Sequence, residues 1–235
     1  MGAVATALLV AIVVFAASTG GVEGGSATPT PTATPESQRD LFGGSLEPRV
    51  RFRTREFVPP LSFVVGDTEW LARDTTSADY VLIERRNRTG QPGGEYPGRS
   101  WLSFSRLPLV YETRHGTAIE APADLYAWMR RHPDLDVGRR EPATIAGVRG
   151  YVFTAHVGFQ RPAVFPPVCI RPDVPCTAIA PNRSLLKGAW METYVLRMPD
   201  GLPLVIDVTG LRRRDLNEVE VPAGELLRTL RFDDR

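Results

Sequence analysis

The residues best suited to acid–base or metal chemistry are three histidines and one pair of neighbouring carboxylates. His115, His132 and His156 share no metal-ligand spacing, and no His-Glu-x-x-His segment occurs. Asp134 and Asp136 are close enough in sequence to bind a hard cation or share a proton, but their segment is typical of a solvated turn after a helix. The sequence therefore predicts no metal site and no cofactor, and a catalytic His/Asp set stays open as an alternative.

A second candidate for catalysis is Ser184-Leu-Leu-Lys187. A Ser-x-x-Lys segment activates the serine nucleophile in penicillin-binding proteins and serine β-lactamases. Those enzymes also need a Lys-Thr/Ser-Gly triad, and Lys187 is the only lysine of the chain. Neither Gly-x-Ser-x-Gly nor the Gly-Lys-Ser/Thr of a phosphate-binding loop occurs. We therefore predict no catalytic residue, and an extracytoplasmic hydrolase that uses Ser184 and Lys187, or a His/Asp set, is the alternative hypothesis.

Cys169 and Cys176 are the two cysteines, and they enclose a short proline-rich loop. Redox catalysis favours Cys-x-x-Cys, and a zinc site needs further ligands that this loop does not supply. In an exported chain, two cysteines at this spacing predict a disulfide. Closing so small a loop is expected to contribute about 2–3 kcal/mol of stability.

The N-terminal region predicts export from the cytoplasm. Residues 3–17 are apolar without a break, which is short for a membrane span but suits the core of a signal peptide. We expect residues 1–27 to be a signal peptide or a signal anchor, because the charge-free stretch extends to Val22. Residues 28–49 begin with a Thr/Pro run that cannot bury a core, and they are expected to form a disordered linker.

The charge balance argues against a polyanionic partner. Lys and Arg number 28 against 27 Asp and Glu, so we expect no nucleic-acid partner and membrane contact only through the N-terminal segment. Arginines cluster at 139–140 and 212–214. Such runs are usually solvated loop charges, and the sequence leaves open whether they come together to bind an anion.

From residue 50 to residue 235 the pattern predicts a single α+β domain with a mostly antiparallel twisted sheet and two main helices packed on it. Stretches rich in β-branched and aromatic residues alternate with Gly/Pro turns, and Ala146-Gly147 is a candidate hairpin turn. Strands are expected at 51–58, 61–65, 69–71, 80–84, 101–107, 142–145, 148–159, 190–198 and 204–208.

Two amphipathic helices are expected to cover this sheet. The first starts at Pro122, has Asp124 in its first turn, and ends at Pro133, which lacks the N–H needed to continue it. The second is expected to open at Pro222. The predicted core residues are Trp101 of the sheet, Leu125, Trp128 and Met129 of the first helix, and Leu226, Leu227 and Leu230 of the second.

Three segments carry a resemblance to a known group. Residues 128–135 read Trp-Met-Arg-Arg-His-Pro-Asp-Leu, residues 144–150 read Thr-Ile-Ala-Gly-Val-Arg-Gly, and residues 226–232 read Leu-Leu-Arg-Thr-Leu-Arg-Phe. The chain resembles uncharacterised extracytoplasmic bacterial proteins with a Trp-x-Arg-x-His-Pro-x-Leu segment, and more distantly the PsbP/Mog1-like sandwich. That resemblance implies binding or assembly and brings no active site.

These observations favour an exported or membrane-anchored binding domain without evident catalytic machinery. Its partner would be a small ligand, a cell-envelope component or a protein. The sequence does not choose among these three, and it does not say which polar residues converge in a cleft.

Overall fold

The structure is a computed structural model that describes residues 37–73, 77–86, 98–111, 117–158, 176–180 and 183–233. The chain divides into two compact units, Met1–Pro35 and Glu36–Arg235, and the following account concerns the second unit. The predicted signal segment, His115 and Cys169 lie outside the described residues, so the export and disulfide predictions stay predictions. Within the described residues, no helix is both long and apolar enough to cross a membrane.

The described residues form two helices and seventeen strands. The helices are α1 (Leu125–Arg131) and α2 (Arg213–Thr229). The strands are β1 (Gln38–Asp40), β2 (Gly44–Ser45), β3 (Arg51–Arg53), β4 (Leu61–Val64), β5 (Trp70–Ala72), β6 (Tyr80–Arg86), β7 (Gly98–Arg106), β8 (Leu109–Tyr111), β9 (Ala118–Glu120), β10 (Leu135–Val137), β11 (Glu141–Ile145), β12 (Val148–Val157), β13 (Cys176–Ala180), β14 (Arg183–Leu186), β15 (Trp190–Arg197), β16 (Pro203–Gly210) and β17 (Arg231–Phe232).

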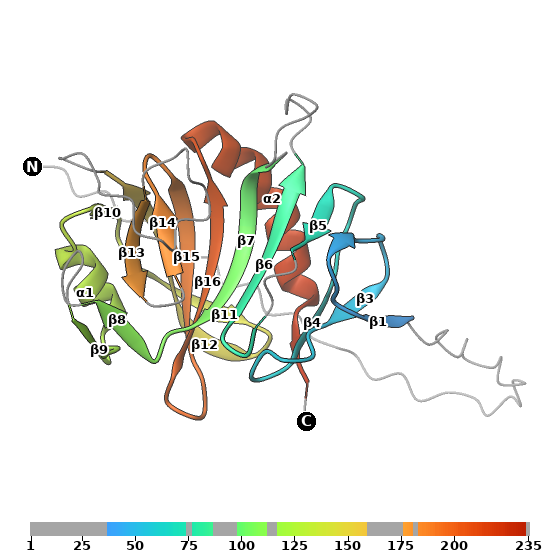
Figure 1. The fold of residues 1–235 in the computed structure, drawn as a ribbon, viewed down its shortest axis with the longest axis horizontal. Coiled ribbons are helices and arrows are strands. Elements are labelled where there is room, and N and C mark those ends of the chain that lie inside the picture. The colour runs from blue at the N-terminus through green and yellow to red at the C-terminus, as the bar shows by residue number, and fades with distance from the viewer. Residues whose placement is uncertain are drawn as a thin grey trace, which may run out of the picture. The chain divides into compact units, whose positions relative to one another are not determined.

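Most strands belong to one antiparallel sheet of nine strands among the described residues (Figure 1). Its order is β10-β12-β15-β16-β7-β6-β5-β2, and β11 pairs with the free stretch of β12. A four-stranded sheet, β1-β3-β4-β17, contains the parallel pair β1 and β3. The α+β class, with a mostly antiparallel sheet and two helices, is thereby confirmed.

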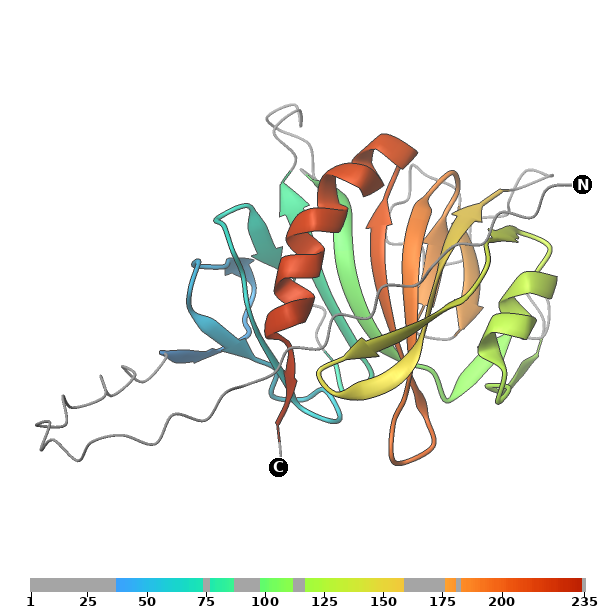
Figure 2. The same cartoon turned by 180° about the vertical axis from the view of Figure 1, so that it is seen from behind.

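The two helices bury different faces of the large sheet, because successive strand residues point to opposite sides. On β16, Ile206 packs in the core beneath α2, whereas its neighbour Val205 packs in the core that contains Leu125 and Met129 of α1. Figure 2 shows α2 lying in front of β7 and β16. Of the predicted core residues, Leu125, Trp128, Met129, Leu226, Leu227 and Leu230 are buried and Trp101 is half-buried.

The structure moves the start of α1 from Pro122 to Leu125. Asp124 is the N-cap rather than a first-turn residue, and its Oδ1 accepts a hydrogen bond from the Ala127 N–H at 3.0 Å. An aspartate cap satisfies one of the N–H groups that a helix leaves unpaired, and this fixes the boundary. The helix ends at Arg131, and His132, immediately before Pro133, is its C-cap.

The expected start of α2 at Pro222 is wrong, because the helix begins at Arg213 and Pro222 lies inside it. Leu216 and Val219 continue the buried face of Ala223 and Leu226 toward the N-terminus. The burial of this longer face stabilises the helix by more than is lost through the one backbone hydrogen bond that proline cannot make.

The predicted boundary of the linker at residue 49 is also too late. Strand β1 pairs with β3, and β2 pairs with β5, so this segment is part of the folded unit. Leu41 and Leu46 are buried in the core beneath α2. The Thr/Pro composition ends before these residues, and three apolar side chains (Leu41, Phe42 and Leu46) among polar residues and glycines were too weak a signal to predict strands.

Candidate functional site

Helix α1 and the β10–β11 connection lie side by side, because a tyrosine and a glycine hold them there. The Tyr126 hydroxyl on α1 donates to the Gly138 carbonyl oxygen at 3.0 Å. Gly138 in turn lies against β12, where its N–H donates to the Thr154 carbonyl oxygen at 2.9 Å. A Cβ at Gly138 would come within 2.6 Å of Thr154 Oγ1, so a larger residue here would require the exposed Thr154 side chain to turn away. Arg139 and Arg140 are thereby placed next to α1.

Four arginines consequently surround one open depression of about 640 Å³, which we call the arginine depression. Its lining consists of Asp124, Tyr126, Ala127, Arg130, Arg131, Arg139 and Arg140. All four arginines are exposed. Two of them end α1, where cations are favourable, and two come from the β10–β11 connection.

The depression carries a positive charge that its own residues do not neutralise. Its lining has four arginines and one carboxylate, Asp124. Arg140 lies 3.5 Å from Asp124 Oδ1, a long and solvent-exposed ion pair that contributes little to stability. The Arg140 guanidinium also lies 5.1 Å from the ring centre of Tyr126 and 5.7 Å from that of Tyr151. These cation–π contacts orient Arg140 without neutralising it.

Tyr151 of β12 lies beside the depression and is placed by its neighbours. Its ring meets Tyr126 edge-on at 6.1 Å and stacks with Phe153. Its hydroxyl oxygen accepts a hydrogen bond from the Tyr126 N–H at 3.2 Å, which leaves the hydroxyl hydrogen to donate elsewhere. Burial raises the pKa of Tyr151, so the hydroxyl stays protonated at neutral pH.

A cavity of about 400 Å³ has Tyr151 in its lining. We call it the apolar cavity, because most of its lining side chains are apolar. They include Ala121, Leu125, Val195, Met198 and Pro203, with Tyr151 and Arg197 as polar members. A concave, mostly apolar site with a few polar groups is the usual form of a small-molecule site, and this volume is within the usual range.

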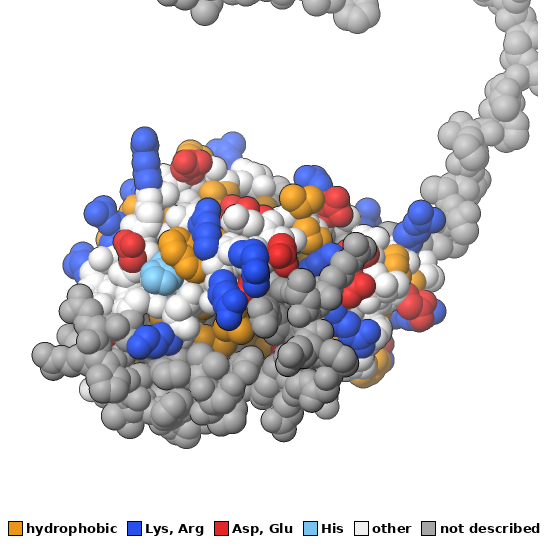
Figure 3. Space-filling model, turned by 90° about the horizontal axis from the view of Figure 1, so that it is seen from above, with side chains coloured by type: hydrophobic (Ala, Val, Ile, Leu, Met, Phe, Trp, Pro, Cys, Tyr) orange, Lys and Arg blue, Asp and Glu red, His pale blue; other side chains and the backbone are white. Residues whose placement is uncertain are grey.

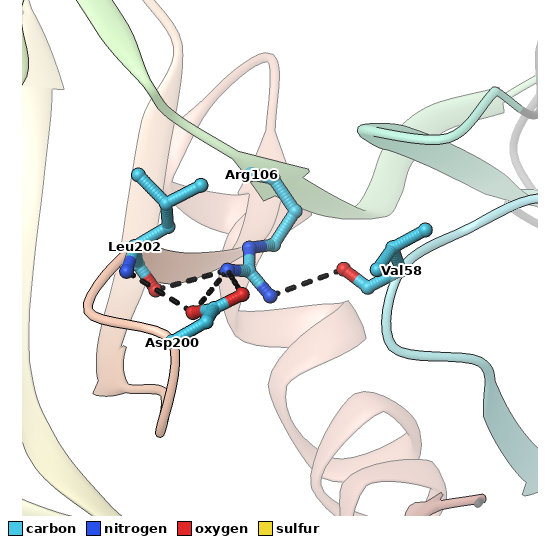
Figure 4. A network of polar contacts seen from close by, with 4 residues as sticks. All are labelled: Val58, Arg106, Asp200 and Leu202. Carbon is cyan, nitrogen blue, oxygen red and sulfur yellow. Dashed lines mark hydrogen bonds and ion pairs between the residues drawn. The ribbon is translucent and has the colours of Figure 1, made fainter. Parts of the chain in front are cut away.

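The turn between β15 and β16, which forms one wall of this cavity, is held by a buried arginine (Figure 4). Arg106 at the end of β7 makes hydrogen bonds of 2.7 and 2.6 Å to the two carboxylate oxygens of Asp200. It also donates to the carbonyl oxygens of Leu202 and Val58. This network joins three segments that are distant in sequence, and it fixes the turn that carries Met198 and Pro203.

Of the residues that the sequence suggested for catalysis, those whose side chains the structure describes do not line the arginine depression or the apolar cavity. Lys187 is exposed in the turn after β14, and the side chain of Ser184 lies outside the described part of the chain. His132 is buried, accepts a hydrogen bond from the Asp134 N–H at 3.2 Å, and meets Trp128 edge-on. Within the described residues, no group of three metal-ligating side chains occurs. Asp136 is exposed and Asp134 is buried, so the two carboxylates do not share one environment.

His156 belongs to a second polar cluster on the face of the sheet that α2 covers. Its ring stacks on Trp190 of β15 at 4.4 Å, and the Arg213 guanidinium lies 5.1 Å from the Trp190 ring centre. Figure 3, which views the molecule from above, shows basic side chains beside hydrophobic ones and a histidine. Arginines 212–214 are exposed at the start of α2, and they do not line the arginine depression.

The sequence analysis missed Tyr126 and Tyr151 as members of a site, and it also missed Arg106. A signal for Tyr151 was present, since it alternates with Phe153 and Ala155 on a long strand and therefore shares their face. No local signal marked Arg106, because its acidic partner is 94 residues away.

Comparisons with known proteins identify no family for this chain. No family model matches the chain, and no curated protein matches it. Among solved structures, the yeast (Saccharomyces cerevisiae) Ran-binding protein Mog1p matches with a TM-score of 0.39 and 11% identity, over 74% of this chain and 90% of that one. A mutant of Mog1 matches with a TM-score of 0.41 and 10% identity, over 78% and 96%. The PsbP protein (CyanoP) of Synechocystis matches with a TM-score of 0.38 and 10% identity, over 78% and 92%. The chain thus has a distant structural similarity to Mog1 and PsbP.

Proposed function

We propose that this chain is an exported binding domain, without a catalytic role, that takes an anionic ligand in the arginine depression. The observation that carries the proposal is the convergence of four exposed arginines with a single carboxylate, Asp124, in one depression. Guanidinium groups match the planar, bidentate geometry of carboxylates and phosphates, and they stay charged at every physiological pH.

The arrangement favours ligand binding because some of its side chains are already ordered before a ligand binds. Tyr126 fixes the distance between α1 and the β10–β11 connection through its hydrogen bond to Gly138. The rings of Tyr126 and Tyr151 orient Arg140. Side chains that are ordered before binding lose less conformational entropy when the ligand arrives, which raises affinity.

Charge removal tests this proposal. Inorganic phosphate is titrated into the full chain, and binding is followed by NMR chemical shifts at low and high salt. The double variant Arg130→Gln/Arg140→Gln should weaken phosphate binding at least about fivefold, and added salt should weaken binding to the parent. Arg149→Gln removes an exposed arginine of β12 outside the depression and is the matched control. If the double variant binds phosphate as the parent does, the depression is not an anion site.

The proposal includes a location outside the cytoplasm, with any membrane contact made through residues 3–22 alone. Its support is the apolar run at 3–17 followed by the Thr/Pro segment. Fractionation of expressing cells should find the chain in the extracytoplasmic or membrane fraction. Full-length protein that is soluble in the cytosol would contradict this part of the proposal.

A disulfide between Cys169 and Cys176 belongs to the same proposal, because an oxidising compartment would close so short a loop. Mass spectrometry of a digest of exported protein, prepared without reduction, should detect the linked peptides. Two free thiols in that material would show that the loop is not bridged.

A further inference from the structure

The arginine depression and the apolar cavity share a wall. Consecutive residues at the start of α1 divide between them, since Ala123 and Leu125 line the cavity whereas Asp124 and Tyr126 line the depression. Tyr151 belongs to the cavity lining, and its ring contacts both Tyr126 and Arg140 of the depression. A molecule that spans this wall would have one end among guanidinium groups and the other end among apolar side chains.

We propose that the ligand is a small acidic amphiphile, a molecule with a single carboxylate or phosphate group on a short apolar chain. This inference rests on the function proposed above and names the class of ligand. The acidic group lies in the arginine depression beside Arg140, and the apolar chain enters the cavity. Tyr151 stands at the junction, where its protonated hydroxyl can donate a hydrogen bond to an oxygen of the acidic group.

The walls of the cavity suit a short chain rather than a charged or sugar-like group. Ala121, Leu125 and Val195 have apolar side chains, and Met198 has an adaptable side chain that can pack against apolar chains of different shape. Each methylene group that leaves water for such a site raises affinity about fourfold. A volume of about 400 Å³ is at the small end of ligand sites, which favours a short chain.

The hydrogen bonds of Arg106 hold one wall of this cavity in a defined position. The Nη2 group of Arg106 donates to both carboxylate oxygens of Asp200 and to the Leu202 carbonyl oxygen, and this fixes the β15–β16 turn on one side of the cavity. On the other side, the Ala121 N–H donates to the Pro108 carbonyl oxygen at 3.0 Å and fixes the entry to α1. Both walls are therefore held by hydrogen bonds within the protein.

Three probes separate the contribution of the acidic group from that of the apolar chain. Each probe is used below its critical micelle concentration and titrated into the full-length protein, with binding followed by calorimetry or NMR. Inorganic phosphate supplies the acidic group alone, octyl phosphate supplies the acidic group and an alkyl chain, and octyl glucoside supplies the same alkyl chain without a charge. Octyl phosphate should bind at least about tenfold more tightly than either of the other two, with hexyl phosphate between it and inorganic phosphate.

Filling the apolar cavity should remove the contribution of the ligand's alkyl chain to affinity and keep the contribution of its acidic group. Ala121→Leu places a larger side chain in the cavity, so octyl phosphate should fall to within about twofold of inorganic phosphate. Ala123→Leu, at an exposed position of the same lining, serves if Ala121→Leu does not fold. Ala143→Leu on β11 lies outside both sites and should preserve the chain-length dependence of the parent.

The outcomes separate the two proposals. If phosphate and octyl phosphate bind the parent equally while Arg130→Gln/Arg140→Gln weakens the binding of both, the arginine depression is an anion site but its ligand is not an amphiphile. Octyl glucoside binding as tightly as octyl phosphate would also overturn the amphiphile, because the acidic group would contribute nothing. If no probe distinguishes the parent from the arginine variant, the proposed function fails as well.

Discussion

Arg106 and Arg140 are the same residue type in opposite environments. The side chain of Arg106 is only 5% exposed and donates to Asp200, Leu202 and Val58. Arg140 is exposed, and Asp124 lies at a long 3.5 Å from it. The first arginine makes its hydrogen bonds to other parts of the fold. The second keeps most of its capacity for something outside the fold.

The difference shows how to separate an arginine that serves structure from one that serves binding. A buried guanidinium loses its water and must be compensated by the protein, so removing it leaves backbone carbonyls without donors. An exposed guanidinium stays hydrated, so its removal costs the fold little. A cluster of exposed arginines that the protein leaves uncompensated, on a surface held rigid by other residues, is therefore available to a ligand.

The largest expected effect comes from the residue that holds the arginine depression against the sheet. Trp128 is 9% exposed and belongs to the core beneath α1, and a helix of seven residues is not stable alone. Trp128→Ala should lower the free energy of unfolding by about 3–5 kcal/mol in urea melts. Arg131→Ala on the polar side of α1 should cost little and is the control. A Trp128→Ala variant that melts like the parent would mean that α1 does not dock as described.

The next effect is the loss of the buried arginine itself. Arg106→Gln should lower the free energy of unfolding by about 2 kcal/mol, because it removes the ion pair with Asp200 and two hydrogen bonds to carbonyl oxygens. Asp200 is 51% exposed and can be hydrated, so the cost stays below that of stranding a buried charge. The same urea melts measure it. A loss under 0.5 kcal/mol would place Arg106 in the same class as Arg140.

Removing the exposed arginine should leave stability almost unchanged. Arg140→Gln gives up one long ion pair and two cation–π contacts, and we expect a loss within about 0.5 kcal/mol. Chemical unfolding of Arg140→Gln beside Arg149→Gln, an exposed arginine of β12, provides the comparison. A loss of more than about 1 kcal/mol for Arg140→Gln alone would show that the fold depends on this side chain.

Local patterns predicted the elements around the site but not the site. The hairpin turn at Ala146-Gly147 was visible because positive φ favours glycine, and both residues do adopt positive φ. The apolar spacing of Leu125, Trp128 and Met129 predicted the helix and the face that it buries. In the second helix the same spacing extends beyond Pro222 toward the N-terminus, and giving the proline more weight than the spacing caused the error.

The site depends on contacts that no local pattern encodes. Arg130 and Arg140 are both visible in the sequence, but their convergence requires Gly138 to lie against β12 and Tyr126 to reach it. Arg106 and Asp200 are 94 residues apart, and only the pairing of β7 with β16 brings them together. Sheet order and register therefore create the site, and these follow from the packing of the whole domain.

Two carboxylates extend the comparison to acidic groups. Partial burial opposes the ionisation of Asp200, but hydrogen bonds from Arg106 and from the Leu202 N–H outweigh it and lower the pKa of this carboxyl below 3.8. Burial raises the pKa of Glu192 on β15 above 4.5, against the opposing hydrogen bond from the Tyr194 hydroxyl and with help from the charge of Glu220. One carboxylate is stabilised as an anion and the other is not.

The smallest effect is the pH dependence of stability that these shifts produce, and it should have opposite signs for the two groups. Because the pKa of Asp200 is lowered on folding, its contribution is present above pH 3.8 and is lost as pH falls through the folded pKa. Asp200→Asn should therefore lower the free energy of unfolding at pH 7, and the difference from the parent should vanish in acid.

Because the pKa of Glu192 is raised, its ionisation costs stability as pH rises from 4.5 through the folded pKa. Glu192→Gln should therefore be slightly more stable than the parent at pH 7 and equal to it below pH 4.5. Urea melts of both variants from acid to neutral pH measure the two trends, and parallel trends would show that burial and pairing do not distinguish these carboxylates.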